Sequence, residues 1–123
     1  MRFVPLLLLV ALSACALFGG GQRYVVFFQE RSAQLDAPAQ GVIAQAAKRA
    51  NNRPTSKVEV IGYTDSGGSP PANLALSRQR AQVVADGLVA NGVAPIRLIR
   101  TGRGQTGADP GVASRRVEIM IAP

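Results

Sequence analysis

The run from Lys57 to Asn91 constrains the fold most, because a strand pattern passes into a long helix pattern with only a short polar loop between them. Lys57 to Tyr63 alternates in character, which predicts a strand with Val58 and Val60 on one face and Ile61 on the other. Runs of helix-forming residues alternate with β-rich runs along the rest of the chain. The sequence therefore predicts a mixed α/β domain.

A helix is expected to begin after Ser69 and to run to Ala90 or Asn91. Ser69 is a good N-cap, and the two prolines that follow it are tolerated in a first helical turn. Gly92 is a natural C-terminal stop. The predicted core stripe of this helix is Leu74, Ala81, Ala85 and Leu88.

The remaining elements follow from similar patterns. Strands are predicted at Arg23–Gln29, Leu98–Gly102 and Arg116–Ile121, and a helix opened by Pro38 is predicted to stop at Asn51–Pro54. The apolar face of that helix is Val42, Ile43, Ala46, Ala47 and Ala50. The order β-α-β-α-β-β predicts one α+β domain over residues 23–123, with a mixed sheet packed by two helices and a right-handed helical crossover.

Residues 1–14 are interpreted as a signal peptide. The apolar run Phe3–Leu12 is broken only by Pro5 and rises about 15 Å as a helix, half of a hydrocarbon core of about 30 Å. Leu12–Cys15 resembles a bacterial lipobox, so Cys15 is expected to become a lipidated N-terminus. The alternative is an ordinary A-x-A cleavage site at Ala14–Ala16, which would give a soluble secreted protein.

Residues 15–22 are predicted to form the lipidated cysteine and a glycine-rich tether. The segment from Ala16 to Gln22 would reach about 25 Å when fully extended. Acyl chains on Cys15 would hold the domain at a bilayer. By resemblance to known sorting rules, alanine rather than aspartate at position 16 favours the outer membrane.

Composition narrows the function classes. The formal charge is +7, and without the leader, which contains Arg2, it is 13 − 7 = +6. This balance favours an anionic partner or serves solubility alone. Dispersed arginines and few aromatic residues argue against nucleic acid. Without histidine, a close carboxylate pair or a metal-ligating cluster, we expect no enzyme, no cofactor and no metal.

The stretch from Gly62 to Val84 contains a long motif with fixed spacing, which resembles that of a known family. Gly62–Val84 contains Gly-x-Thr-Asp, a short loop, and then Asn-x-x-Leu-Ser-x-x-Arg-Ala-x-x-Val. This stretch resembles the OmpA C-terminal domain family, which includes the Pal lipoproteins and the periplasmic part of MotB. Phe28 with Ser32–Leu35 resembles the opening of the family pattern, and Arg115–Glu118 resembles its close. The resemblance covers Val25 to Ile121.

The resemblance implies non-covalent binding of peptidoglycan through the diaminopimelate of its stem peptide. This ligand group carries an ammonium and a carboxylate on one carbon, and the matching positions are Asp65 for the ammonium and Arg80 for the carboxylate. Independently of the family, Asn73, Ser77 and Arg80 share one helix face that can point at the loop carrying Asp65. An arginine fork there can hold a carboxylate through two bonds.

Other readings of these residues remain open. Asp65 and Arg80 could form an internal ion pair, while Asn73 and Ser77 could serve helix capping and packing. Further candidates are Leu76 as core or pocket wall, Thr64 as a loop or ligand contact, and Arg115 as a second carboxylate contact. Arg115 and Arg116 alternate along a strand, so at most one of them faces the site.

The chain departs from the family pattern near the site. Gln29-Glu30-Arg31 stands where family members often carry acidic residues, so an acidic contact is lost or replaced by Glu30. Ser114 replaces a common asparagine, and the short segment from Gln105 to Ala113 reduces one rim of the pocket.

The expected function is that of an outer-membrane lipoprotein whose periplasmic domain binds the wall. The competing interpretation is an envelope lipoprotein that contacts proteins, such as Tol-Pal-like partners, and has weak or lost wall binding.

Overall fold

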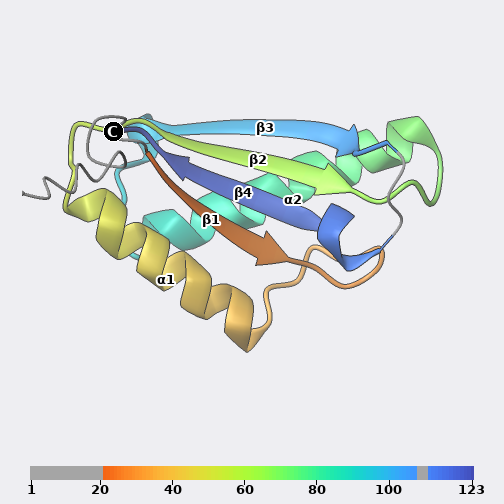
Figure 1. The fold of residues 1–123 in the computed structure, drawn as a ribbon, viewed down its shortest axis with the longest axis horizontal. Helices are drawn as coiled ribbons and strands as arrows, with labels where there is room; N and C mark the ends of the chain where they lie inside the picture. Colours follow the sequence, from red (N-terminus) through yellow and green to blue (C-terminus); the bar gives the residue numbers. More distant parts are fainter. Residues whose placement is uncertain (1–20, 108–110) are drawn as a thin grey trace, which may run out of the picture.

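The computed structural model describes residues 21–107 and 111–123, which form a layered arrangement of helices and strands (Figure 1). The elements are β1 (Gln22–Phe27), α1 (Ala37–Asn51), β2 (Val58–Thr64), α2 (Pro70–Ala90), β3 (Leu98–Gln105) and β4 (Arg116–Ile121). Short 3-10 turns cover Pro95–Arg97 and Val112–Ser114. The predicted order of helices and strands is confirmed.

Part of the sequence interpretation lies outside the described residues. It comprises the leader, the lipid-bearing Cys15 and all of the tether except Gly21 and Gln22, and Gln22 already belongs to β1. Within the described ranges, no helix combines the length and apolar character needed to cross a bilayer.

The four strands form one mixed sheet in the order β1-β4-β2-β3. β2 and β3 run parallel, and β4 is antiparallel to both of its neighbours, β1 and β2. The last residues of β1, β2 and β3 therefore meet the first residue of β4 at one edge, which lies at the right in Figure 1. We call it the site edge, and it is marked by Phe27, Thr64, Gln105 and Arg116.

Both helices begin where side chains cap them. Ser69 accepts a hydrogen bond from the Ala72 amide and opens α2, as predicted. Asp36 does the same for α1 through the Ala39 amide. Gly92 follows α2 with a φ of 95°, a left-handed conformation that favours glycine.

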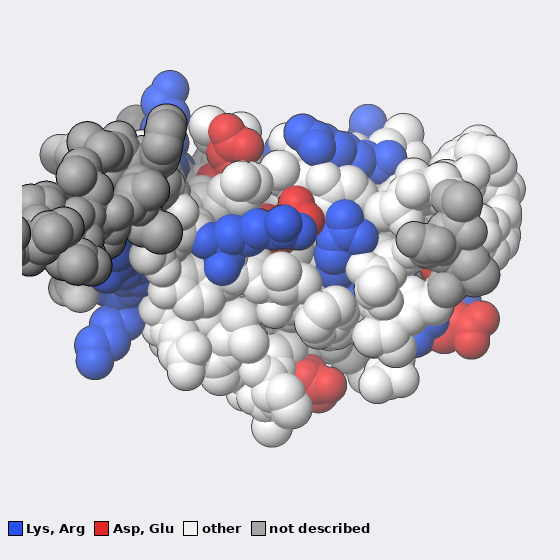
Figure 2. Space-filling model, viewed as in Figure 1, with Lys and Arg blue, Asp and Glu red and all other residues white. Residues whose placement is uncertain are grey.

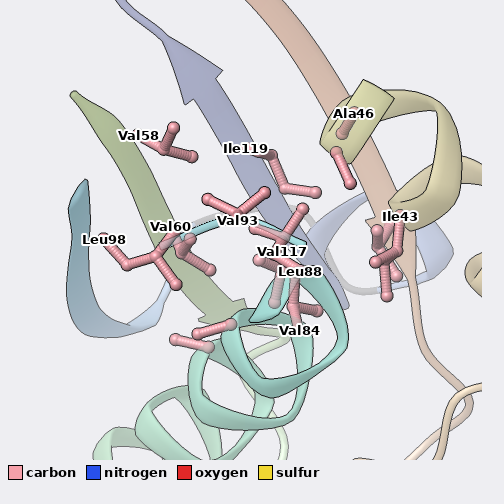
Figure 3. Packing of buried hydrophobic residues seen from close by; sticks show 14 of the residues in the cluster. Ile43, Ala46, Val58, Val60, Val84, Leu88, Val93, Leu98, Val117 and Ile119 are labelled. Atoms are coloured by element: carbon pink, nitrogen blue, oxygen red, sulfur yellow. The ribbon is translucent and has the colours of Figure 1, made fainter. Parts of the chain in front are cut away.

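The core lies between the sheet and the two helices (Figure 3). The predicted inward residues of β4 (Val117, Ile119 and Ile121) are buried, as are Val58 and Val60 of β2. From α1 and α2 the core receives Ile43, Ala46, Ala47, Ala50, Ala81, Val84, Ala85 and Leu88. Because many of these helix residues are small, the helices can approach the sheet closely.

Two paired glycines bring α2 especially close to the sheet. Gly62 of β2 and Gly102 of β3 lie opposite each other in the parallel register. A Cβ on Gly62 would lie 1.9 Å from the Ser77 carbonyl oxygen, and one on Gly102 would lie 2.7 Å from the Ser77 hydroxyl. The absence of side chains at these two positions therefore sets the height of α2 over the site edge.

Leu74 and β3 differ from the expectations. Leu74 belongs to the predicted core stripe but is only partly buried, whereas Val84 is fully buried. β3 extends to Gln105, since it stays paired with β2 beyond Gly102 across a register shift. Val42 packs against the core, as its place on the apolar face of the first helix predicts. Ile61 lies on the face away from the helices, as predicted, and is 3% exposed because β2 is a central strand flanked by β3 and β4.

The sheet face turned away from α2 carries mixed charges (Figure 2). On this face Glu118 pairs with Arg23 and with Arg116, whose Nε lies 3.2 Å from the carboxylate. The Arg116 guanidinium also stacks 4.3 Å above the centre of the Tyr63 ring. These contacts direct Arg116 to the open sheet face.

Candidate functional site

Asp65 follows β2 directly and lies at the site edge, with 7% of its surface exposed. Its Oδ1 accepts hydrogen bonds from the Gly67 amide at 3.1 Å and from Arg31 Nη2 at 3.0 Å, and its Oδ2 accepts one from Arg115 Nη1 at 3.4 Å. Burial raises the pKa of Asp65, but hydrogen bonds from Gly67, Arg115 and Arg31 outweigh burial and lower that pKa below its usual value. Asp65 is therefore an ionised acceptor.

Arg115, the residue directly before β4, contacts Asp65. Its Nε donates to the Phe28 carbonyl at 3.0 Å, and its side chain is 15% exposed. Because Arg116 faces the opposite side of the sheet, only one of the two adjacent arginines reaches the site. The structure places Arg115 beside Asp65, and its contact with a ligand carboxylate stays a prediction.

Arg80 lies beneath the site and is fully buried. Its Nε, Nη1 and Nη2 donate to the carbonyls of Ser32, Tyr63 and Gln29 at 2.8, 3.0 and 3.1 Å. Burial lowers the pKa of Arg80 to about 10, although the charge of Asp65 acts to raise it, so the guanidinium stays charged at neutral pH. Arg80 thereby ties the segment after β1 to the end of β2.

These contacts bear on the two interpretations of Arg80, as the partner of Asp65 in an internal ion pair and as a contact for a ligand carboxylate. The alternative of an internal ion pair between Asp65 and Arg80 is wrong in that form, since Asp65 pairs instead with Arg31 and Arg115. The contact of Arg80 with a ligand carboxylate stays a prediction. Because Arg80 has no exposed surface, that contact requires the segment above it to move.

Asn73 and Ser77 are both fully buried on the face of α2 that also carries Arg80. Asn73 Oδ1 accepts from Arg31 Nη1 at 3.0 Å, and its Nδ2 donates to Gln105 Oε1 at 3.2 Å. The Ser77 hydroxyl donates to the Leu74 carbonyl at 2.7 Å and accepts from the Gly104 amide at 2.9 Å. Ser77 therefore ties α2 to β3.

Thr64 and Leu76 are the remaining predicted site residues. Thr64 is fully buried at the end of β2, and its hydroxyl oxygen has no hydrogen-bond partner among the described residues. Leu76 is partly buried on α2.

Arg31 is the site residue that sequence reasoning missed. Its guanidinium contacts Asp65, Asn73 and the Gly67 carbonyl, and its side chain is 42% exposed. The signal was present in the sequence, because Arg31 belongs to the segment that departs from the acidic family pattern. Glu30, the expected replacement for an acidic contact, is exposed instead.

The charges grouped around Asp65 are unbalanced. Three guanidinium groups (Arg31, Arg80 and Arg115) surround the carboxylate of Asp65, which gives 3 − 1 = +2. Two hollows of about 300 and 420 Å³ lie elsewhere, at the opposite end of the sheet and between α1 and the end of α2. We place the site at Asp65 because the charged and hydrogen-bonding groups converge there.

A sequence model of the OmpA family matches residues 27–117. The chain belongs to the OmpA family. A curated relative is the probable lipoprotein YiaD of Escherichia coli strain K12, 35% identical over 105 residues that make up 80% of this chain and 48% of that protein. Another is the peptidoglycan-binding protein ArfA of Mycobacterium tuberculosis, 38% identical over 65% of this chain and 27% of that protein. This OmpA-family chain thus spans about half or less of these relatives' lengths.

Solved structures share the OmpA-family fold. The OmpA-like domain of FopA1 from Francisella tularensis has a TM-score of 0.73 and 28% identity, covering 82% of this chain and 72% of that one. The peptidoglycan-associated lipoprotein from Burkholderia pseudomallei has a TM-score of 0.69 and covers 80% of this chain and 88% of that one. Its 23% identity supports the fold alone.

Proposed function

We propose that this chain binds peptidoglycan non-covalently through the diaminopimelate of the stem peptide. The observation that carries the proposal is an ionised Asp65 beside the partly exposed guanidinium of Arg115, at the edge of an OmpA-family domain. An ammonium and a carboxylate on one carbon complement such a pair of groups. Relatives named as a peptidoglycan-binding protein and a peptidoglycan-associated lipoprotein support the choice of polymer.

Each group has a distinct task in this proposal. Asp65 accepts the ligand ammonium, and Arg115 donates to the ligand carboxylate. Arg80 holds the loops from below and adds a buried positive charge. The Thr64 hydroxyl is unpaired among the described residues but fully buried, so it could meet a bound group only if the loop above it moved. Hydrogen bonds to charged groups contribute about 1.5 to 3 kcal/mol each, so a single contact with one stem peptide is modest. Binding to the wall as a whole gains from many stem peptides along the polymer. No catalytic step is part of this function.

We further propose that the protein is an outer-membrane lipoprotein anchored through Cys15, with its domain in the periplasm. The motif Leu12–Cys15 supports the anchor, and relatives named as lipoproteins or outer-membrane proteins support the compartment. Mass spectrometry of the mature N-terminus tests the anchor. An acylated Cys15 is the expected result, and a free N-terminus at Ala16 or beyond would contradict it.

One observation favours the competing function of an envelope lipoprotein with weak wall binding. The Arg31 guanidinium already pairs with the Asp65 carboxylate, the group on which ligand binding depends. In that case the domain would act through protein contacts, such as those of Tol-Pal-like partners. The two functions differ in whether the chain is retained by purified wall.

The test is retention of the full chain, solubilised in detergent micelles, by purified sacculi. Wild type should sediment with the sacculi, and free diaminopimelate should release it. Asp65→Asn, which keeps the shape of the side chain and removes its charge, should lose most of the retention. Arg100→Gln is the matched control, because Arg100 is exposed on β3 and lies outside the network around Asp65. Unchanged retention of Asp65→Asn would refute the site, and no retention of wild type would refute the function.

A further inference from the structure

Arg31 holds the part of the site that a ligand ammonium needs. Its Nη2 lies 3.0 Å from Asp65 Oδ1 and also donates to the Gly67 carbonyl, while its Nη1 lies 3.0 Å from Asn73 Oδ1. A guanidinium and an ammonium have the same charge and seek the same acceptors. Asp65 Oδ1 already accepts from the Gly67 amide and from Arg31, so its two lone pairs are in use while Arg31 is in place.

The backbone directs Arg31 to this place. Arg31 has a φ of 55° and is the one non-glycine residue with a positive φ among residues 21–107 and 111–123. Residues other than glycine, asparagine and aspartate seldom adopt this conformation, so the surroundings must hold it. Arg80 stabilises this backbone conformation, because it donates hydrogen bonds to the carbonyls of Gln29 and Ser32, on either side of Arg31. Backbone strain of this kind concentrates at functional sites.

We propose that Arg31 is a specificity-determining residue that occupies the ammonium position on Asp65, so that diaminopimelate binds only after the Arg31 side chain has moved away. The proposal rests on the proposed function and deepens it. With Arg31 in place the four charged groups sum to +2, and the site accepts an anion more readily than a cation. Arg31 thus reduces the advantage of a zwitterionic ligand over a plain dicarboxylate.

The Arg31 side chain can move away from Asp65 while the other contacts of the site remain. Its side chain is 42% exposed, against 15% for Arg115, so its charge is readily hydrated once released. Asp65 would keep its bonds to the Gly67 amide and to Arg115. Ion pairs this exposed contribute little, which makes displacement by a ligand feasible.

The test compares two ligands on the full chain in detergent micelles by titration calorimetry. Diaminopimelate has both ammonium groups, and pimelate is the same dicarboxylate without them. Arg31→Asn removes the cation and suits a positive φ. It should tighten diaminopimelate binding about fivefold, equivalent to about 1 kcal/mol, and leave pimelate binding unchanged or weaker. Arg31→Lys keeps the charge and should behave as wild type, as should the control Arg100→Gln.

The outcomes separate this inference from the proposed function. Equal diaminopimelate binding by wild type and Arg31→Asn would overturn the inference and leave the function standing. Binding by Arg31→Asn but not by wild type would support the inference and overturn wall binding by the natural chain. Tighter binding of both ligands to Arg31→Asn would show a general loosening and overturn the role in specificity. If no variant binds diaminopimelate, both proposals fall.

Discussion

At the scale of single residues, Arg80 donates hydrogen bonds to three backbone carbonyls from two segments of the chain. Because these carbonyls lie beside a fully buried side chain, water cannot easily replace the guanidinium. Asp65 is buried too, but two of its donors, Arg31 and the Gly67 amide, belong to exposed residues. Arg80 therefore supports the site from within, and Asp65 presents the charge.

Arg80→Ala should lower the free energy of unfolding by about 3 kcal/mol. Each hydrogen bond to a charged group contributes about 1.5 to 3 kcal/mol, and removal of the desolvation cost of the guanidinium offsets part of the loss. Urea unfolding followed by circular dichroism measures the change. The exposed Arg100→Ala should stay within about 0.5 kcal/mol of wild type. A loss below about 1 kcal/mol for Arg80→Ala would contradict a supporting role.

The residues of the site were easier to predict than their contacts. The positions of Asp65 and Arg115 follow from the sequence, because Asp65 directly follows a predicted strand and Arg115 alternates with Arg116. The partners of Arg80 do not follow, since they lie 48, 17 and 51 residues away and are carbonyls that any sequence possesses. Arg31 was missed for a related reason: its φ of 55° turns the side chain onto Asp65, and no local pattern indicates that turn.

At the scale of elements, the distance between α2 and the sheet depends on Gly62. Gly62→Ala would place a Cβ 1.9 Å from the Ser77 carbonyl oxygen, so α2 must shift. We expect a loss of about 2 to 3 kcal/mol in the free energy of unfolding, as for overpacked cores. Gly41→Ala is the matched control, because Gly41 lies within α1 and a Cβ there meets nothing within 4 Å. It should stabilise the chain by about 0.4 to 1 kcal/mol. Equal stability of the two variants in urea would contradict the close approach.

Elements with strong local signals were predicted well, and those shaped by neighbours were not. Ser69 and Gly92 delimit α2 because a cap and a left-handed stop act within one turn. The added length of β3 depends on pairing with β2, and the burial of Ile61 depends on strands from both sides. Leu74 matched a helical stripe but lies near the start of α2, where the helix passes beyond the main core.

At the scale of the whole molecule, the chain enters the domain opposite the site. β1 begins at Gln22, which pairs with Ile121 at the end of β4, so both described ends lie at the edge away from Asp65 (Figure 1). Seven residues of β2 separate the two edges, a length of about 23 Å. A domain attached through its N-terminus would therefore hold the site edge away from the attachment. This arrangement is compatible with the proposed function, in which the anchor and the wall lie at opposite ends of the domain.

The geometry makes the direction of attachment testable. In a Cys15→Ser background, a cysteine added after Pro123 should allow immobilisation without loss of sacculus-fragment binding, because that end lies at the same edge as Gln22. Ser66→Cys is the matched variant at the site edge: Ser66 is exposed and follows Asp65 directly. Immobilisation through it should abolish binding, since the support then covers the approach to the carboxylate. Surface plasmon resonance with fragments of sacculi measures both. If both attached forms bound the fragments equally, the ligand would have to reach the domain elsewhere than at Asp65. Attachment through Ser66→Cys places the site edge against the support, so a ligand that binds there could not reach it.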